Sequence, residues 1–233
     1  MRIVTVGTLK GGTGKTTLAV NLAAAAEGRG IRTVIIDLDP QQSAGKWADQ
    51  RPKAGDGADR PAVLSGQASR LEPVFREAER FAPELVLMDT AAHEPEILKP
   101  AIDQAAVVLI PSRPAGIELQ HIMETAVLVA EKRKPVAVIL NAVPARAHEL
   151  DDARRFVEAK GIPLAPLIIS DLRAYARAVT AAQGVTEQEP GGKAAEEINA
   201  LLDWLIEHLQ IPASRIDGKD ESRLSLSPEI LTA

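Results

Sequence analysis

The chain has 233 residues, of which 45% are hydrophobic and only 3% aromatic, and its formal net charge is −5. This length suits one sizeable α/β domain with a core of Ala, Val, Leu and Ile. The complete absence of cysteine excludes disulfides, thiolate zinc sites, cysteine nucleophiles and cysteine-ligated iron–sulfur clusters, and it fits a reducing cytoplasm.

Short aliphatic runs alternate with longer helical patterns, which predicts βαβ units and a mostly parallel, twisted sheet with helices on both faces. The expected strands are Arg2–Gly7, Thr33–Asp37, Leu85–Asp89, Val107–Pro111, Val136–Asn141 and Leu164–Ile169. The expected helices are Lys15–Gly28, Ser69–Phe81, Glu94–Gln104, Ile117–Glu131, Glu149–Ala159, Ala174–Ala182 and Gly192–Leu209. The pattern therefore indicates a three-layer α/β fold.

Two segments lack such periodicity. Arg51–Pro61 is rich in Gly, Asp, Lys and Pro and predicts an exposed loop, while Pro212–Ala233 is polar and predicts a flexible tail. We therefore expect one domain over residues 1–210 and a tail over residues 211–233. No run approaches the roughly 18 apolar residues of a membrane span, so no membrane association is predicted.

A glycine-rich loop connects the first expected strand to the first expected helix, which is the context that a phosphate-binding loop requires. In such loops the glycines let backbone N–H groups point into one concavity, Lys15 reaches the β- and γ-phosphates, and Thr16 offers its hydroxyl to Mg²⁺. ATP and Mg²⁺ are thus the expected cofactors. The residues expected to bind the nucleotide here are Gly11, Gly12, Thr13, Gly14, Lys15, Thr16 and Thr17.

The loop departs from the usual phosphate-binding pattern, because Leu9 stands where that pattern begins with Gly, and an additional lysine, Lys10, follows. The segment Lys10–Thr17 resembles the deviant Walker A motif of the ParA/MinD family of partitioning and positioning ATPases. This resemblance implies the three-layer P-loop NTPase fold. It also implies a homodimer that sandwiches ATP, in which Lys10 reaches the phosphates of the partner subunit as a catalytic residue alongside Lys15.

Two aspartates lie at the end of the second expected strand, in Asp37-Leu38-Asp39-Pro40-Gln41. The segment is similar to the family's Asp-x-Asp-Pro-Gln motif, which implies that Asp39 is catalytic, orienting the attacking water near Mg²⁺. Ligands of open α/β sheets bind at the carboxyl ends of the strands, which suits this role. The alternative is that these carboxylates cap the next helix, and for Asp37 that alternative is about equally good.

Two further strands deliver polar residues to their ends. Leu85–Asp89 has the form of a Walker B strand, so Asp89 is expected to hold Mg²⁺ through water. The family's Asp-Thr-Pro-Pro motif continues here with Ala91 and Ala92 in place of the prolines. At Asn141 the family places an asparagine that contacts adenine, and a turn-forming asparagine is the alternative. The expected metal site thus combines Thr16, Asp39 and Asp89.

Composition separates the branches of this family. The iron–sulfur branches need cysteines that this chain lacks, and the expected tail has no apolar stripe of the kind that anchors the MinD branch to membranes. The chain therefore resembles the small ParA proteins that lack an N-terminal helix-turn-helix domain. By this resemblance Arg173, Arg177 and Lys193 bind DNA phosphates without reading sequence, and ordinary solvated charges are the alternative.

The sequence thus predicts a ParA-type partition ATPase. Its ATP-bound homodimer would bind non-specific DNA, placing it on the nucleoid, and a ParB-like or other small adaptor protein would stimulate slow hydrolysis. One alternative keeps the ATPase but gives it a different cargo, such as a microcompartment, a chemoreceptor cluster or a conjugation complex. Another is a metabolic enzyme similar to dethiobiotin synthetase. The four histidines show no metal-ligand spacing and are assigned no function.

Overall fold

The computed structural model describes residues 1–51, 60–146 and 148–211. Over these residues seven strands form one sheet, and every neighbouring pair of strands is parallel. The strands are β1 (Arg2–Val6), β2 (Thr33–Asp37), β3 (Ala62–Ser65), β4 (Leu85–Asp89), β5 (Val107–Ser112), β6 (Val136–Val143) and β7 (Leu164–Ser170). The expected parallel α/β architecture is confirmed.

The strand order is β3-β2-β4-β1-β5-β6-β7, which places β1 at the centre between β4 and β5. Asp89 at the end of β4 is in register with Asp37 on β2 and with Val6 on β1. Because all the strands point the same way, their carboxyl ends meet at one edge of the sheet. The loop after β1 and both aspartates therefore converge on that edge.

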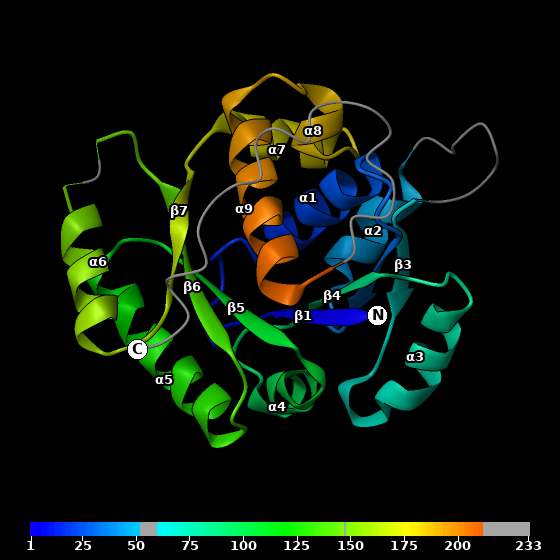
Figure 1. Ribbon diagram of the computed structural model, residues 1–233, viewed down its shortest axis with the longest axis horizontal. Coiled ribbons are helices and arrows are strands. Elements are labelled where there is room, and N and C mark those ends of the chain that lie inside the picture. The colour runs from blue at the N-terminus through cyan, green and yellow to red at the C-terminus, as the bar shows by residue number, and fades with distance from the viewer. Residues whose placement is uncertain (52–59, 147, 212–233) are drawn as a thin grey trace.

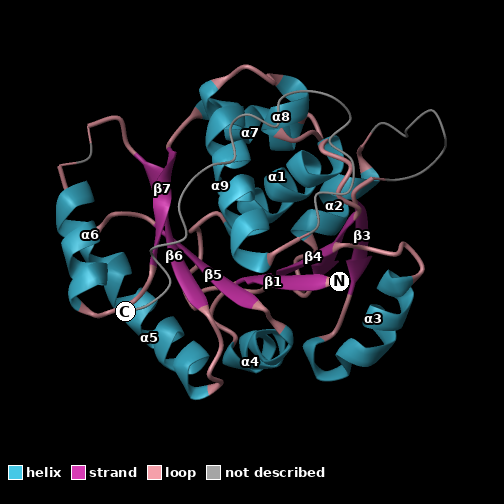
Figure 2. Cartoon of the chain, viewed as in Figure 1, coloured by secondary structure: helices cyan, strands magenta, loops and turns pink. Residues whose placement is uncertain are grey.

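Helices cover both faces of the sheet (Figures 1 and 2). One face carries α1 (Lys15–Gly28), α2 (Ser43–Asp49), α7 (Arg173–Thr180), α8 (Val185–Gln188) and α9 (Lys193–Leu209). The opposite face carries α3 (Leu71–Glu79), α4 (Pro95–Gln104), α5 (Gly116–Glu131) and α6 (Leu150–Ala159). The result is the three-layer arrangement that the sequence predicts.

Successive side chains along each strand point to opposite faces of the sheet, so hydrophobic residues form a core on each face. On β2, Ile35 packs into the cluster around α1 and α9, whereas Val34 and Ile36 pack into the cluster under α3 and α4. Almost the whole length of α1 is buried, and its small alanines let it pack closely between the sheet, α8 and α9. The helix that follows the phosphate loop is thus anchored along most of its length.

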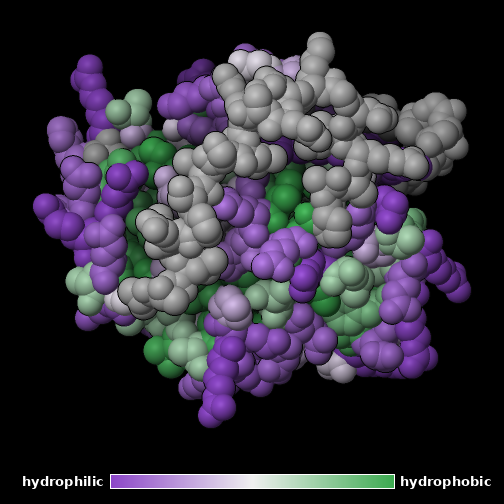
Figure 3. Space-filling model, viewed as in Figure 1, coloured by the Kyte–Doolittle hydropathy of each residue, from purple (hydrophilic) through white to green (hydrophobic). Residues whose placement is uncertain are grey.

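The surface is more mixed than the core. In Figure 3 hydrophilic side chains cover much of the face in view, and hydrophobic ones gather in smaller groups between them. Large hydrophobic side chains among the described residues that are strongly exposed are Met1, Phe81 and Val127. No helix in the described ranges is both long enough and apolar enough to cross a bilayer.

Three elements of the structure are absent from the sequence-based prediction. They are α2, β3 and α8, which are seven, four and four residues long. Periodicity over so few residues carries little information, and α2 also contains Gly45, a weak helix former. Tertiary contacts stabilise these elements instead, because β3 pairs with β2 at the edge of the sheet and α8 packs against α1 and α9.

Other boundaries differ by one or two residues. The helix expected over Ser69–Phe81 divides into a 3-10 turn, Ala68–Arg70, and α3, while β6 continues past Asn141 to Val143. The expected loop Arg51–Pro61 has neither helix nor strand at its described residues. The expected tail Pro212–Ala233 lies outside the described residues. The proposed domain limits therefore stay a prediction, although α9 ends at Leu209 as expected.

Candidate nucleotide-binding site

The loop after β1 has the backbone of an anion cradle. Gly12 and Gly14 adopt φ angles of 74° and 87°, which side chains rarely tolerate, and α1 begins at the next residue, Lys15. A Cβ atom at Gly14 would lie only 2.5 Å from Nδ2 of Asn141. Glycine is thus required at position 14 by both conformation and space, and the N-terminus of α1 faces the cradle.

Lys15 lies inside this loop. Its side chain is largely buried, and its ammonium donates a hydrogen bond to the carbonyl oxygen of Lys10 at 3.2 Å. Burial lowers the pKa of Lys15, and the neighbouring carboxylates of Asp89 and Asp39 oppose that shift. The ammonium therefore sits at the centre of the cradle, where phosphate oxygens can replace its bond to the loop.

Two of the three residues expected to hold the metal, Thr16 and Asp89, contact each other. The Thr16 hydroxyl donates to Oδ2 of Asp89 at 2.6 Å, and the carboxyl group of Asp89 is fully buried. Burial raises the pKa of Asp89 to about 7, with the charges of Asp37 and Asp39 adding to the shift and Thr16 and Lys15 opposing it. Its Oδ1 is buried without a hydrogen-bond partner. An unpaired buried carboxylate oxygen beside a hydroxyl fits a hard divalent cation such as Mg²⁺.

The two aspartates at the carboxyl end of β2 have different surroundings. Oδ2 of Asp37 accepts the backbone N–H groups of Ala44 and Gly45, each at 3.0 Å, at the start of α2. Asp37 therefore caps the next helix, so the alternative considered for it is confirmed. Asp39 is only partly buried, and Asp37 accepts its N–H. Asp39 also influences the pKa of Lys15, which places its carboxylate near the cradle.

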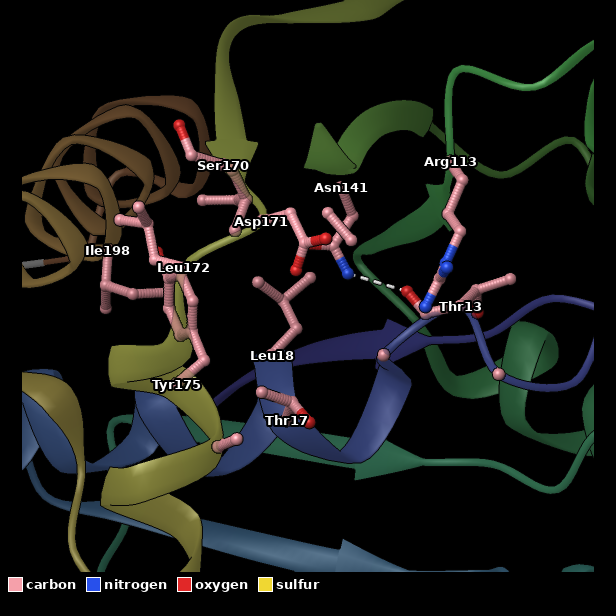
Figure 4. Close-up of a pocket in the computed structure, with 15 residues that line it drawn as sticks. Thr13, Thr17, Leu18, Arg113, Asn141, Ser170, Asp171, Leu172, Tyr175 and Ile198 are labelled. Carbon is pink, nitrogen blue, oxygen red and sulfur yellow. Dashed lines mark hydrogen bonds between the residues drawn. The ribbon is translucent and has the colours of Figure 1, made fainter. Parts of the chain in front are cut away.

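A pocket of about 390 Å³ adjoins the cradle (Figure 4). Asn141 lines it and donates from Nδ2 to the carbonyl oxygen of Thr13 at 2.6 Å. The register of β6 against β7 shifts between Leu140 and Val143, and Ala142 has a φ of 50°, so the strand is irregular beside Asn141. Asn141 thus ties the pocket wall to the phosphate loop. Its expected contact with adenine stays a prediction.

Some pocket residues were missed from the sequence. Arg113 follows β5, Asp171 follows β7, and Tyr175 lies on α7. The rule that pointed to Asp39 and Asp89, a polar residue just after a parallel strand, applies equally to Arg113 and Asp171. They were missed because no family motif drew attention to them.

The expected DNA-binding residues lie on α7 and at the start of α9. Arg173 is exposed. Arg177 forms an ion pair with Glu189 at 3.2 Å, and Lys193 lies 3.7 Å from Glu197. The carboxylates of these pairs neutralise part of the positive charge that would otherwise attract DNA phosphates. The structure thus brings the phosphate loop, Asp39, Asp89 and Asn141 together, and it places the basic residues on two helices, α7 and α9, that also contribute Tyr175 and Ile198 to the adjoining pocket.

His93 lies closer to the site than its sequence context indicates. Its N–H donates to the carbonyl oxygen of Leu9 at 3.0 Å, and its Nε2 would lie 3.4 Å from a Cβ atom at Gly11. Within the described ranges, however, no three His, Cys, Asp or Glu residues form a metal-binding group. His93 is therefore a neighbour of the loop with no ligand role assigned.

A family model for the CobQ/CobB/MinD/ParA nucleotide binding domain matches residues 4–185. The maintenance of carboxysome distribution protein A of Gloeobacter kilaueensis is 34% identical over 212 residues, which cover 89% of this chain and 94% of that relative. The protein ParA of Rhizobium radiobacter is 28% identical over 185 residues, covering 75% of this chain and 81% of the relative.

Among solved structures, the septum site-determining protein MinD of Pyrococcus horikoshii, complexed with Mg-ADP, has a TM-score of 0.69 to this chain. The two are 17% identical, and the match covers 88% of this chain and 95% of that one. At this identity the similarity shows a shared fold.

Proposed function

The chain belongs to the CobQ/CobB/MinD/ParA nucleotide-binding family and is an ATPase of the ParA/MinD type, and we propose that it uses ATP to position a protein-built cargo, such as a microcompartment. Proteins of this family form ATP-dependent dimers and bind partner proteins. In the proposed cycle the ATP-bound homodimer binds non-specific DNA of the nucleoid, and an adaptor protein on the cargo stimulates hydrolysis. The protein would work in the cytoplasm.

Each part of the site has a task in this cycle. The loop N–H groups and Lys15 bind and orient the β- and γ-phosphates, and Asp39 orients the attacking water. Thr16 and Asp89 would hold Mg²⁺, which neutralises charge on the phosphate oxygens when bound. Lys10 reaches the phosphates of the partner subunit's nucleotide. Nucleotide state thereby controls dimerisation.

The observation that carries the choice of cargo is the 34% identity to a carboxysome distribution protein over nearly the full length of both chains. The sequence resemblance favoured DNA partition, but the relative named ParA is matched at lower identity and over a smaller share of this chain. Both functions require the same ATP site, so the site itself does not separate them. The proposal of a protein-built cargo therefore rests on overall sequence similarity.

Deleting the gene in its host would test this proposal. If the protein positions a microcompartment, the compartments should cluster in the mutant, as seen by fluorescence microscopy of a labelled shell protein. Plasmid retention and chromosome content should be unchanged. Evenly spaced compartments together with plasmid loss or anucleate cells would instead establish DNA partition, the second candidate, which the relationship to ParA favours.

The dimer is tested separately with Lys10→Ala. We expect this variant to retain nucleotide binding, because Lys15 serves its own nucleotide, but to lose ATP-dependent dimerisation, DNA retention and stimulated hydrolysis together. Light scattering, a filter-binding assay and phosphate release measure the three. If all three were unchanged, Lys10 would have no role across a dimer.

A further inference from the structure

We infer that Arg113 is a nucleotide-binding residue that contacts the α- and β-phosphates of the nucleotide in its own subunit. The inference deepens the proposed function and rests on it, because it concerns the same ATP site. No motif in the sequence points to Arg113. Its position in the fold does.

Arg113 follows the last residue of β5, and β5 pairs directly with β1, the strand that leads into the phosphate loop. The N–H of Gly7 also donates to the carbonyl oxygen of Leu109 at 3.0 Å, so the two strands remain paired at their carboxyl ends. Arg113 and the phosphate loop therefore leave the sheet side by side. The hydroxyl of Ser112 donates to the carbonyl oxygen of Arg113 at 3.1 Å, which restrains the start of this connection.

The side chain of Arg113 points from this connection toward Thr13 (Figure 4). Arg113 and Thr13 line the same pocket, together with Gly12, Gly14 and Thr17. In loops of this kind the backbone N–H groups cradle the α- and β-phosphates. A guanidinium beside Thr13 is therefore placed to approach phosphate oxygens bound by the loop, and its fork of donors suits two oxygens at once.

Arg113 has no hydrogen-bond or ion-pair partner for its guanidinium among the described residues. Some other arginines of the same chain do. Arg51 pairs with Glu187 at 2.6 Å, and Arg177 pairs with Glu189 at 3.2 Å. Arg113 thus differs from them in presenting unused donors to a pocket.

The electrostatics of the site call for such a cation. Four carboxylates lie at or near the cradle and the pocket, on Asp37, Asp39, Asp89 and Asp171. Lys15 is the cation largely buried beside them, and its ammonium already donates to the carbonyl oxygen of Lys10. A polyphosphate adds further negative charge to that of these carboxylates, and Mg²⁺, Lys15 and the proposed contact from Lys10 of the partner subunit only partly offset the total. A further cation beside the loop would reduce the remaining repulsion.

The test compares Arg113→Ala and Arg113→Lys with the wild type. A matched control is Arg80→Ala, which removes an exposed arginine at the end of α3, far from the pocket. Calorimetric titration with Mg-ATP and with Mg-ADP gives the two affinities. We expect Arg113→Ala to weaken both about tenfold, because both nucleotides carry the α- and β-phosphates, and tenfold corresponds to about 1.4 kcal/mol. Arg113→Lys should recover part of the loss, and Arg80→Ala should match the wild type.

Two results would overturn the inference. One is Arg113→Ala binding both nucleotides within twofold of the wild type. The other is unchanged binding with slower hydrolysis, which would mean that Arg113 acts on the partner subunit's nucleotide. Circular dichroism and a thermal melt confirm that each variant is folded.

Lys15→Ala separates this inference from the proposed function: if that variant alone loses binding, the ATP site stands and the role of Arg113 fails. If the wild type binds neither nucleotide, the proposed function fails.

Discussion

The phosphate-loop end of the sheet and the α7–α9 surface differ in how tightly their functional residues are constrained. In the loop, Gly14, Lys15, Thr16 and Asn141 each contact another site residue or the loop backbone. On the α7–α9 surface, Arg177 lies in an exposed ion pair with Glu189, of the kind that contributes little, and the exposed ammonium of Lys193 lies 3.7 Å from Glu197. Loss of a single atom should therefore matter greatly in the first region and little in the second.

The largest expected effect on nucleotide binding is that of Gly14→Ala. The new Cβ atom would clash with Asn141 in a backbone conformation that alanine rarely adopts. Strain of this kind costs about 1–3 kcal/mol, so Mg-ATP affinity should fall up to about 100-fold. The control is Gly28→Ala at the end of α1, where a Cβ atom meets nothing within 4 Å. Equal affinities for the two variants would show that the loop can relax.

Thr16→Ala should nearly match that effect in catalysis. It removes the hydroxyl that bonds Asp89 and that would reach Mg²⁺. The expected result is a fall in Mg²⁺-dependent ATP hydrolysis of about 100-fold, since metal stabilisation is worth several kcal/mol. Phosphate release measured over a Mg²⁺ titration tests this, with the exposed Thr180→Ala as control. Unchanged hydrolysis at all Mg²⁺ concentrations would remove Thr16 from the metal site.

Glu197 is expected to be an exception on the α7–α9 surface, because its side chain is mostly buried. Its carboxylate accepts the N–H and the hydroxyl of Ser170 and the hydroxyl of Tyr175. Glu197→Ala leaves these donors unsatisfied, and we expect it to lower the free energy of unfolding by about 2–4 kcal/mol. Urea denaturation measures the change. The neighbouring, exposed Glu196→Ala is the control, and comparable losses in both would contradict the prediction.

A smaller effect is expected from pH. Burial, and then the negative charge of Glu197, raise the pKa of Tyr175 above its usual value of 10.0. The folded protein then binds this proton more tightly than the unfolded chain, so the stability linked to it is complete below about pH 10 and falls as pH rises further. Denaturation of the wild type and of Tyr175→Phe at several alkaline pH values tests this. The decline should be shallower in Tyr175→Phe, and parallel declines would contradict it.

The smallest effects are expected at the basic residues. If Arg173 contacts a DNA phosphate, Arg173→Ala should weaken ATP-dependent DNA binding severalfold and reduce the slope of log affinity against log salt by about 0.9. Arg177→Ala should do less, because Glu189 already pairs with Arg177. Filter binding over a range of salt concentrations measures both. A larger loss for Arg177→Ala would reverse this ranking.

Much of the fold could be predicted, because long elements carry a clear periodicity. The bounds of α1, β2 and β4 agree residue by residue with the expectation. The failures were α2, β3 and α8, which are too short for a pattern and depend on tertiary contacts. Asp37 illustrates the limit for single residues, because its role as the cap of α2 depends on a helix that the sequence pattern did not delimit.

The sequence by itself determined the phosphate loop, its strand and helix, and the carboxylates Asp39 and Asp89. These are local features, in which the spacing of a few residues along the chain already implies the chemistry. Tertiary structure alone decided that Asn141 hydrogen-bonds to Thr13, 128 residues away, and that Glu197 accepts hydrogen bonds from Ser170 and Tyr175. It also decided that the side chain of Arg113 points at the phosphate loop. The physical reason is that these groups meet only where parallel strands and their helices pack together, and no local spacing records that meeting.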